Sequence, residues 1–396
     1  MAANVNFSMM LHNSELSDHL DGILAAYAQQ AGVQVAKREI TYEQGRAEFV
    51  NNAIYGGAFD VSEMGSTWVD DFVGMSALRP CQPFAESIMG SLDNYPPVLL
   101  SACSDAQGVL YGIPWMTDLS MVYYRRDMFQ KAGIKDDGAF SSPERFHETL
   151  SALADAGIET PWLMPTTRSY VSIHELFIWL QASGYNYLDE SGRRVTLADP
   201  GPRQVLRSYL ALHKYLPTDE KRITSEQADR LFMDGKAAVR VSGPWMPRYC
   251  APEVRETLAM AIPMNRTYLG GSGLVLWNTS RHPLESVNLV RRLADRDDIV
   301  TLAVSAGMLP ARLDKIRDLP ADYLLPEYRL LVESAIRGGI SIPKTPLSGM
   351  VEERIVTMLE MLWQRFFESQ SGDIDQLLDN ELDMVVNRLN MVLSNY

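Results

Sequence analysis

The N-terminal part of the chain alternates between two patterns of apolar residues. Short apolar runs are typical of strands, whereas apolar residues that recur every three or four positions, as Leu16, Leu20 and Leu24 do, indicate the buried face of a helix. The predicted elements are a strand at residues 5–10, a helix from a cap at Ser14 to Gly32, a strand from Val33, a helix at residues 45–55 and a strand at residues 60–64. This order is typical of an α/β fold with a parallel sheet.

Three loops are predicted to follow the carboxyl ends of these strands. Ligands of open parallel sheets collect at that edge, so the loops supply candidates for ligand contact. Ser14 is equally explained as a helix cap, and Trp68 as a residue that closes the core beneath the next helix. The candidates are His12, Asn13, Ser14 and Glu15 in the first loop, Glu43 and Gln44 in the second, and Ser66, Thr67 and Trp68 in the third.

The rest of the chain is richer in helical patterns. Gly270-Gly271-Ser272-Gly273 precedes an apolar strand at residues 274–277. No internal repeat and no low-complexity tract interrupts the chain. The helices are predicted at residues 142–156, 173–183, 201–215, 225–235 and 283–294, with a late one whose apolar stripe runs from Val351 to Leu362.

Length and charge exclude several classes of protein. The 396 residues exceed the roughly 250–300 at which single cores stop growing, so we expect two domains. The formal net charge of −14 argues against nucleic acid as a partner, because its backbone requires clustered Lys and Arg. No apolar run approaches the roughly 20 residues of a membrane-spanning helix.

The cysteines and histidines form no recognisable metal or redox motif. Cys81, Cys103 and Cys250 lack a CxxC spacing, and the six histidines include neither an HExxH motif nor a pair four residues apart. We therefore predict no metal site and no cofactor. Cys81 and Cys103 are the nearer pair for a disulfide in an oxidising compartment, and buried thiols are an equal alternative.

The first residues of the chain, Met1-Ala2-Ala3-Asn4-Val5-Asn6-Phe7, lack the basic and apolar segments of a secretory signal. The protein is then either cytosolic or begins after a leader that has been removed. The sequence leaves both possibilities open.

The segment at residues 111–127 is the most informative for ligand chemistry. Trp115 and Asp118 lie three residues apart, after a Gly-Pro turn that is expected to carry the backbone across a domain boundary. An aromatic face and a nearby acceptor suit a neutral, hydroxyl-rich ligand, whose C–H patches avoid water while its hydroxyls stay paired. The segment therefore indicates one wall of a sugar site. Alternatively, Trp115 packs between domains and Asp118 forms a turn.

Several short segments recur in one known family in the same order and spacing. They are residues 59–68, Ala77-Leu78-Arg79-Pro80, residues 111–134, residues 232–238, Ser242-Gly243-Pro244-Trp245 and Gly270-Gly271-Ser272-Gly273. Together they resemble the family 1 extracellular solute-binding proteins of ABC importers, the group that includes maltose-binding protein. The resemblance extends from near residue 5 to about residue 365.

The resemblance implies a two-lobed α/β periplasmic-binding-protein fold of type II, in the family 1 sugar-binding class. The lobes are discontinuous: residues 1–116 with 266–312, and residues 117–265 with 313–396. It further implies a hinge, a cleft between the lobes for a mono- or oligosaccharide, and delivery to the transmembrane subunits of an ABC permease. A periplasmic or extracellular location, a monomeric state and the absence of catalysis follow from the same resemblance.

Further site residues come from the resemblance. The position of Asp118 carries a sugar-binding carboxylate in relatives, and that of Trp245 a stacking tryptophan, although a Trp is also a common core residue. Tyr170 combines a ring with a hydroxyl beside the expected cleft. Gly271 and Gly273 either bring backbone N–H groups to the ligand or form a tight turn. Arg312 either donates to a hydroxyl or is solvated.

Two other functions stay open at this level. Paired carboxylates such as Glu43 and Asp118 are the residues with which a glycosidase cleaves its substrate, and such residues carry no sequence motif. The same fold also binds polyamines, peptides or metal chelates in other proteins, and an acidic chain offers carboxylates for an amine. The tryptophans Trp68, Trp115 and Trp245 favour a sugar.

Overall fold

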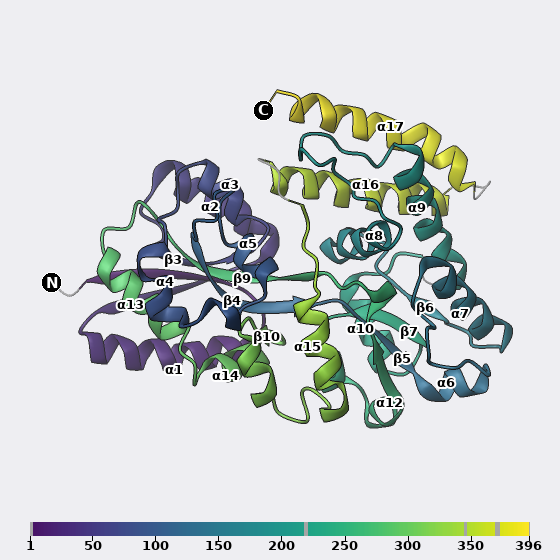
Figure 1. The fold of residues 1–396 in the computed structure, drawn as a ribbon, viewed down its shortest axis with the longest axis horizontal. Helices are drawn as coiled ribbons and strands as arrows, with labels where there is room; N and C mark the ends of the chain where they lie inside the picture. The colour runs from purple at the N-terminus through teal and green to yellow at the C-terminus, as the bar shows by residue number, and fades with distance from the viewer. Residues whose placement is uncertain (1–2, 218–220, 344–346, 369–372, 396) are drawn as a thin grey trace. The chain divides into compact units, whose positions relative to one another are not determined.

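The computed structural model describes residues 3–217, 221–343, 347–368 and 373–395 (Figure 1). The chain divides into two compact units. Unit 1 contains Met1–Asp118 and Leu269–Leu324, and unit 2 contains Leu119–Tyr268 and Leu325–Tyr396. The chain thus passes between units after residues 118, 268 and 324, where the sequence predicted boundaries after residues 116, 265 and 312.

The last boundary lies later than expected because residues 313–324 pack within unit 1. The hydroxyl of Tyr323 donates a hydrogen bond to the carbonyl of Met308 at 2.8 Å. Asp314 accepts hydrogen bonds from the guanidinium of Arg312 at 3.1 and 2.9 Å. The chain therefore leaves unit 1 only after this segment.

Unit 1 is built on one mixed sheet. Its strands are β1 (Asn4–Met10), β2 (Gln34–Ile40), β3 (Val61–Gly65), β4 (Gly112–Leu119), β9 (Leu269–Leu276) and β10 (Leu309–Pro310). Over the described residues the strand order is β10-β4-β9-β3-β1-β2. β1 pairs in parallel with β2 and with β3, so the predicted parallel arrangement of the first three strands is confirmed. β9 runs antiparallel to β3, and β10 antiparallel to β4.

Helices cover both faces of this sheet (Figure 1). They are α1 (Ser14–Ala31), α2 (Tyr42–Tyr55), α3 (Val69–Gly74), α4 (Gln82–Met89), α5 (Pro97–Ala102), α13 (Pro283–Leu293) and α14 (Ile299–Ala306), with 3-10 turns η1 (Leu92–Asn94) and η4 (Leu313–Asp318). Tyr27 of α1 donates a hydrogen bond to the carbonyl of Glu285 at the start of α13. On the other face, Phe49 of α2 and Phe72 of α3 join one apolar core with Trp68.

The start of α1 corrects one prediction. Asn13, and not Ser14, caps the helix, because its side-chain oxygen accepts a hydrogen bond from the N–H of Leu16 at 3.0 Å. The side-chain amide of Asn13 also donates to the carbonyl of Ser305 at 2.7 Å, which ties the helix start to α14. The predicted stop is confirmed, since Gly32 adopts the left-handed conformation that ends many helices.

The start of α2 corrects another prediction. The helix begins at Tyr42 rather than at Gly45, because the side chain of Thr41 caps it by accepting from the N–H of Gln44. Glu43 and Gln44 therefore lie in the first helical turn and not in a loop. Gln44 is exposed, and the side chain of Glu43 lies outside the described part of the structure.

The predicted Gly-Pro turn before Trp115 is wrong. Gly112, Pro114 and Trp115 all lie within β4, and the chain leaves unit 1 only after Asp118. A proline fits a strand where its missing N–H is not needed. The pairing of β4 with β10 involves only Met116 and Thr117, so Pro114 lies beyond that ladder.

Unit 2 is built on a smaller sheet covered by many helices. Its strands are β5 (Met121–Arg125), β6 (Trp162–Leu163), β7 (Val239–Ser242) and β8 (Leu258–Ala261), in the order β6-β7-β5-β8 over the described residues. The helices are α6 (Arg126–Lys131), α7 (Pro143–Asp155), α8 (Tyr170–Ala182), α9 (Pro200–Leu210), α10 (Ser225–Met233), α11 (Met246–Tyr249), α12 (Pro252–Thr257), α15 (Arg329–Arg337), α16 (Ser348–Glu368) and α17 (Ile374–Leu393), with 3-10 turns η2 (Ala211–Tyr215), η3 (Pro263–Asn265) and η5 (Pro326–Tyr328).

The helices predicted in this half of the chain are confirmed as α7, α8, α9 with η2, α10, α13 and α16. In unit 2 the apolar faces of α7, α8, α9 and α16 meet in one core, where Trp162, Trp179 and Trp363 are buried, whereas α13 belongs to unit 1. Burying such large side chains stabilises a fold by several kcal/mol in total, at roughly 25 cal/mol for each Å² of apolar surface removed from water. This core fixes the position of β7 and of the loop that follows it.

The cysteines and helices answer two questions that the sequence left open. All three cysteines lie in the described part as buried thiols that form no disulfide. Burial raises the pKa of the Cys250 thiol to about 11, so this side chain stays protonated near neutrality. None of the described helices combines the length and the apolar character needed to cross a membrane.

Gly271 and Gly273 lie inside β9, and not in a turn before a strand as predicted. Gly271 has a φ of +134°, and a Cβ there would lie 2.2 Å from the carbonyl oxygen of Met116. A Cβ on Gly273 would lie 2.9 Å from the sulfur of Cys103. Both glycines thus allow β9 to pack closely against its neighbours.

We expect Gly271→Ala to lower the free energy of unfolding by roughly 1–3 kcal/mol, because the added methyl group collides with backbone atoms and not with a flexible side chain. Urea denaturation would measure this change. Gly22→Ala is the matched control: Gly22 lies in the exposed part of α1 with nothing within 4 Å of the new Cβ, so it should stabilise the protein by roughly 0.5–1 kcal/mol. A Gly271→Ala chain as stable as the native one would contradict the close packing.

Candidate functional site

In unit 1 several polar groups contact the buried carboxylate of Glu63, near the ends of β1 and β3. Glu63 lies on β3 with its side chain fully buried. It accepts hydrogen bonds from the backbone N–H of Met10 at 2.9 Å and from the hydroxyl of Ser272 at 2.7 Å. Its other contact is the Nε2 atom of His12 at 3.0 Å. One carboxylate thus joins residues from β1, β3 and β9.

His12 and Glu63 each favour the charged form of the other. Burial alone would lower the pKa of His12, but the Glu63 carboxylate and, more weakly, Asp118 raise it above its ordinary value. Burial alone would raise the pKa of Glu63, but His12 and the hydrogen bonds to the carboxylate hold it below its ordinary value. The side chain of His12 is 19% exposed, so the imidazole reaches the surface of this cluster.

Asp118 lies at the end of β4 and belongs to the same cluster. Burial raises the pKa of its carboxyl to about 6, although the N–H of Gly270 and the charge of His12 act in the opposite direction. Thr117 beside it donates a hydrogen bond to the carbonyl of Gly270 at 2.7 Å, which fixes the end of the strand. Carboxylates held in this way are strong acceptors for hydroxyl groups.

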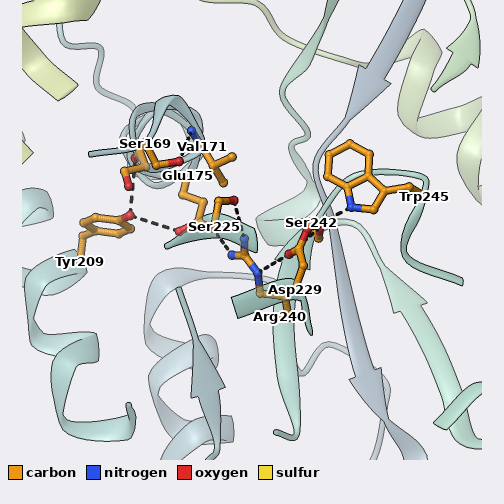
Figure 2. A network of polar contacts seen from close by, with 10 residues as sticks. Ser169, Val171, Glu175, Tyr209, Ser225, Asp229, Arg240, Ser242 and Trp245 are labelled. Atoms are coloured by element: carbon orange, nitrogen blue, oxygen red, sulfur yellow. Dashed lines mark hydrogen bonds and ion pairs between the residues drawn. The ribbon is translucent and has the colours of Figure 1, made fainter. Parts of the chain in front are cut away.

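In unit 2 the side chain of Trp245 is held by a buried ionic network (Figure 2). Trp245 follows β7 and precedes α11, and its indole N–H donates to Asp229 of α10 at 3.0 Å. The six-membered ring lies against Gly243, where an added Cβ would be 1.9 Å from a ring carbon. Of the seven tryptophans, all of them described, Trp245 alone is not buried.

Asp229 is also held by two side chains of β7, Arg240 and Ser242. It accepts hydrogen bonds from Nε of Arg240 at 2.9 Å and from the hydroxyl of Ser242 at 3.0 Å. Arg240 is fully buried and also donates to Glu175 of α8 at 2.8 Å. Burial raises the pKa of Glu175 to about 7, although Arg240 and the hydroxyl of Tyr209 lower it.

Two of the predicted tryptophans lie in the interior of unit 1. Trp115 is 1% exposed, and its indole N–H donates to the carbonyl of Leu293 at 2.8 Å. Trp68 is also 1% exposed and packs in the core, with its ring centre 4.5 Å from that of Tyr42. These positions match the packing alternatives that the sequence offered for both tryptophans.

Arg312 is also buried. Its guanidinium donates to the carbonyl of Met89 at 2.9 Å and to both carboxylate oxygens of Asp314, and it lies over the ring of Tyr95. The predicted alternative of a solvated side chain is therefore wrong. The contacts tie the start of η4 to α4.

The remaining candidates differ in burial and in contacts. Ser66 is buried, and its N–H donates to the carbonyl of Gly271 at 2.9 Å. Tyr170 lies in unit 2 at the start of α8, where its hydroxyl donates to Glu353 at 2.7 Å. Ser14 and Gln44 are exposed, whereas Glu15 and Thr67 are partly buried.

A family model described as "Bacterial extracellular solute-binding protein" matches residues 22–319. The chain belongs to this family. The resemblance seen in the sequence is thereby confirmed, and with it the assignment to a family of extracellular binding proteins.

Similar proteins agree with this membership of the solute-binding family. A binding protein of Brucella abortus is 20% identical over 329 residues, which cover 80% of this chain and 78% of that protein. Maltose-bound MalE3 of T. maritima has a TM-score of 0.79 at 19% identity, and covers 99% of this chain and 100% of its own. An ABC transporter solute-binding protein of Thermotoga lettingae bound with α-D-tagatose has a TM-score of 0.78 at 17% identity, with coverage of 99% and 100%. At these identities the two structures confirm the predicted fold.

Sequence reasoning missed the charged residues that organise this solute-binding protein. Glu63 was placed in a strand but not considered as a site residue, and neither Arg240 nor Asp229 was considered. A usable signal was present: Glu63 follows Val61-Ser62, and Arg240 lies between two valines, so each charge interrupts a buried strand. A charge in such a place is almost always paired, which implies a partner elsewhere in the chain.

We expect the stability of Glu175→Gln relative to the native protein to increase as the pH rises from about 4.5 to about 7. The unfolded chain loses the Glu175 proton near 4.5 and the folded chain only near 7, so the native fold loses stability across this window. Glutamine does not titrate. Urea unfolding at a series of pH values would measure the difference.

Glu190→Gln, at an exposed position of unit 2, is the control, and its stability difference should stay flat over the same range. A difference for Glu175→Gln that is independent of pH would show that Glu175 is already ionised in the folded protein.

Proposed function

We propose that this chain is the solute-binding component of an ABC import system and that its cargo is a mono- or oligosaccharide. The observation that carries the proposal is the partly exposed indole of Trp245. Asp229 takes up its N–H, so the indole offers a ligand its aromatic surface and not a hydrogen-bond donor. An aromatic surface stacks well on the C–H face of a sugar ring.

The cluster of unit 1, taken by itself, offers groups that form hydrogen bonds with sugar hydroxyls. Asp118 accepts hydroxyl hydrogen bonds, and His12 adds a partly exposed imidazole beside Glu63. The charge of His12 is balanced by Glu63 within the protein, so a neutral ligand leaves the ionic pairing intact. The sugars bound by the similar proteins of T. maritima and Thermotoga lettingae support the same class of cargo.

The other cargoes and the enzyme fit less well. A polyamine requires several carboxylates for its amines, whereas Glu63 is already paired with His12, so Asp118 is, among the described residues, the one further carboxylate of this cluster. Family membership supports binding without catalysis. The permease as partner, a monomeric state and a periplasmic or extracellular location belong to the same proposal. Hydrolysis of chromogenic glycosides by the purified protein would overturn the non-catalytic assignment.

We expect Trp245→Ala to weaken sugar binding roughly ten-fold or more while leaving the fold intact, because it removes a stacking surface that is only partly buried. Thermal-shift screening with maltose, maltotriose and D-tagatose, followed by calorimetry, would measure this. Trp115→Ala is the comparison, and should cost roughly 3–5 kcal/mol of stability. A Trp115→Ala protein that folds normally but no longer binds would instead identify Trp115 as a ligand contact.

We expect the affinity for the bound sugar to increase as the pH rises through about 6, because Asp118 then becomes a carboxylate and accepts stronger hydrogen bonds. Asp118→Asn should remove this increase and bind roughly ten-fold more weakly at neutral pH. Calorimetry at about pH 5 and about pH 7 would show it. Asp93→Asn, at an exposed position of unit 1, should behave as the native protein does. A pH dependence that persists in Asp118→Asn would assign the titration to another group, of which His12 is the nearest.

A further inference from the structure

The indole of Trp245 is held on two sides by groups that do not themselves offer a stacking surface. One side is the polar contact between Nε1 and Oδ2 of Asp229 at 3.0 Å. The other is Gly243, whose lack of a side chain leaves the space in which the six-membered ring lies. A side chain with few rotatable bonds that is fixed at its N–H and against its ring has little freedom left to lose when a ligand arrives.

Asp229, which accepts the hydrogen bond from the indole, is itself held in place by other side chains. Asp229 accepts hydrogen bonds from two side chains of β7: from Nε of Arg240, and from the single hydroxyl of Ser242, whose oxygen lies 3.0 Å from both carboxylate oxygens. Arg240 is anchored in turn by Glu175 of α8 at 2.8 Å and by Ser225, at the start of α10, at 3.4 Å (Figure 2). The backbone below is also tied, because the hydroxyl of Tyr123 donates to the carbonyl of Gly243 at 2.8 Å.

The order of these contacts separates two roles within one network. Glu175 pairs with Arg240 and lies on the far side of the guanidinium from Trp245. Asp229 pairs with the same guanidinium and alone of these two carboxyl groups also contacts the indole. A network that serves the indole needs Asp229 in a way that it does not need Glu175.

We propose that Asp229 is a positioning residue that, held by Arg240 and Ser242, fixes the indole of Trp245 over Gly243 before the ligand binds. The inference rests on the proposed sugar-binding function and deepens it, because it assigns part of the affinity to a residue that never touches the sugar. A stacking surface fixed in advance avoids the entropy cost of ordering the ring during binding.

The first experiment needs no ligand. Because Trp245 alone of the seven described tryptophans is not buried, acrylamide should quench its emission in preference to the others. Trp245→Phe identifies that component. We expect Asp229→Ala and Gly243→Ala each to increase its quenching constant and shift its emission to the red, and Glu175→Gln to leave both unchanged.

Gly243→Ala keeps the test valid even if Asp229→Ala fails to fold. It leaves Asp229 and Arg240 in place and displaces the ring only through the new methyl group, and the backbone of Gly243 has no positive φ that alanine would resist. If neither Gly243→Ala nor Asp229→Ala changes the quenching, the indole is not held as proposed and the inference is overturned.

The second experiment is a double-mutant cycle in sugar affinity, with maltose, maltotriose and D-tagatose as probes. Asp229→Ala should weaken binding about ten-fold in the native background and leave it unchanged in the Trp245→Phe background, because its effect passes through the indole. An equal loss in both backgrounds would overturn the positioning role. If none of these sugars binds the native protein, the proposed cargo fails, while the quenching comparison still decides how Trp245 is held.

Discussion

The buried guanidinium of Arg240 is the charge on which the proposed stacking surface depends. Removing a charge from water costs several kcal/mol unless partners replace the lost hydration, and Arg240 is almost completely buried. Asp229 and Glu175 supply the partners from α10 and α8, so the requirement to neutralise one cation fixes two helices against β7. The position of Trp245 follows from that requirement, because Oδ2 of Asp229 accepts a hydrogen bond from the indole N–H.

In unit 1 the deeply buried ionisable group is an acid, Glu63, whereas in unit 2 it is the base Arg240. Glu63 is satisfied by the N–H of Met10 at the end of β1, by the imidazole of His12 in the loop that follows, and by the hydroxyl of Ser272 on β9, which is distant in the sequence. The result is a different kind of surface. Unit 2 presents an aromatic side chain supported by ions, whereas unit 1 presents ionisable groups supported by strand ends. Each unit thus carries its own kind of ligand-facing group.

The sequence predicted the regular parts of the fold well, because apolar periodicity directly reflects which face of an element is buried. The strands before Gly65 and the helices of unit 2 follow from it. The prediction is wrong where a residue type occurs in two kinds of structure. Pro114 lies in β4 and not in a turn, and Asn13 rather than Ser14 caps α1. Of the site, Trp245 and Asp118 were visible as residue types in loops, but Asp229 was not, because its partner Arg240 is eleven positions away on another element.

The strand order of unit 1 has a consequence for how the chain matures. β9, which comes from residues 269–276, lies in the interior of the sheet between β4 and β3. The first strands of unit 1 therefore meet the strand that completes their sheet only after residues 269–276 have been made. Contacts this distant in sequence form slowly. The sheet of unit 1 is thus expected to close late in folding, after its first three strands and their helices are available.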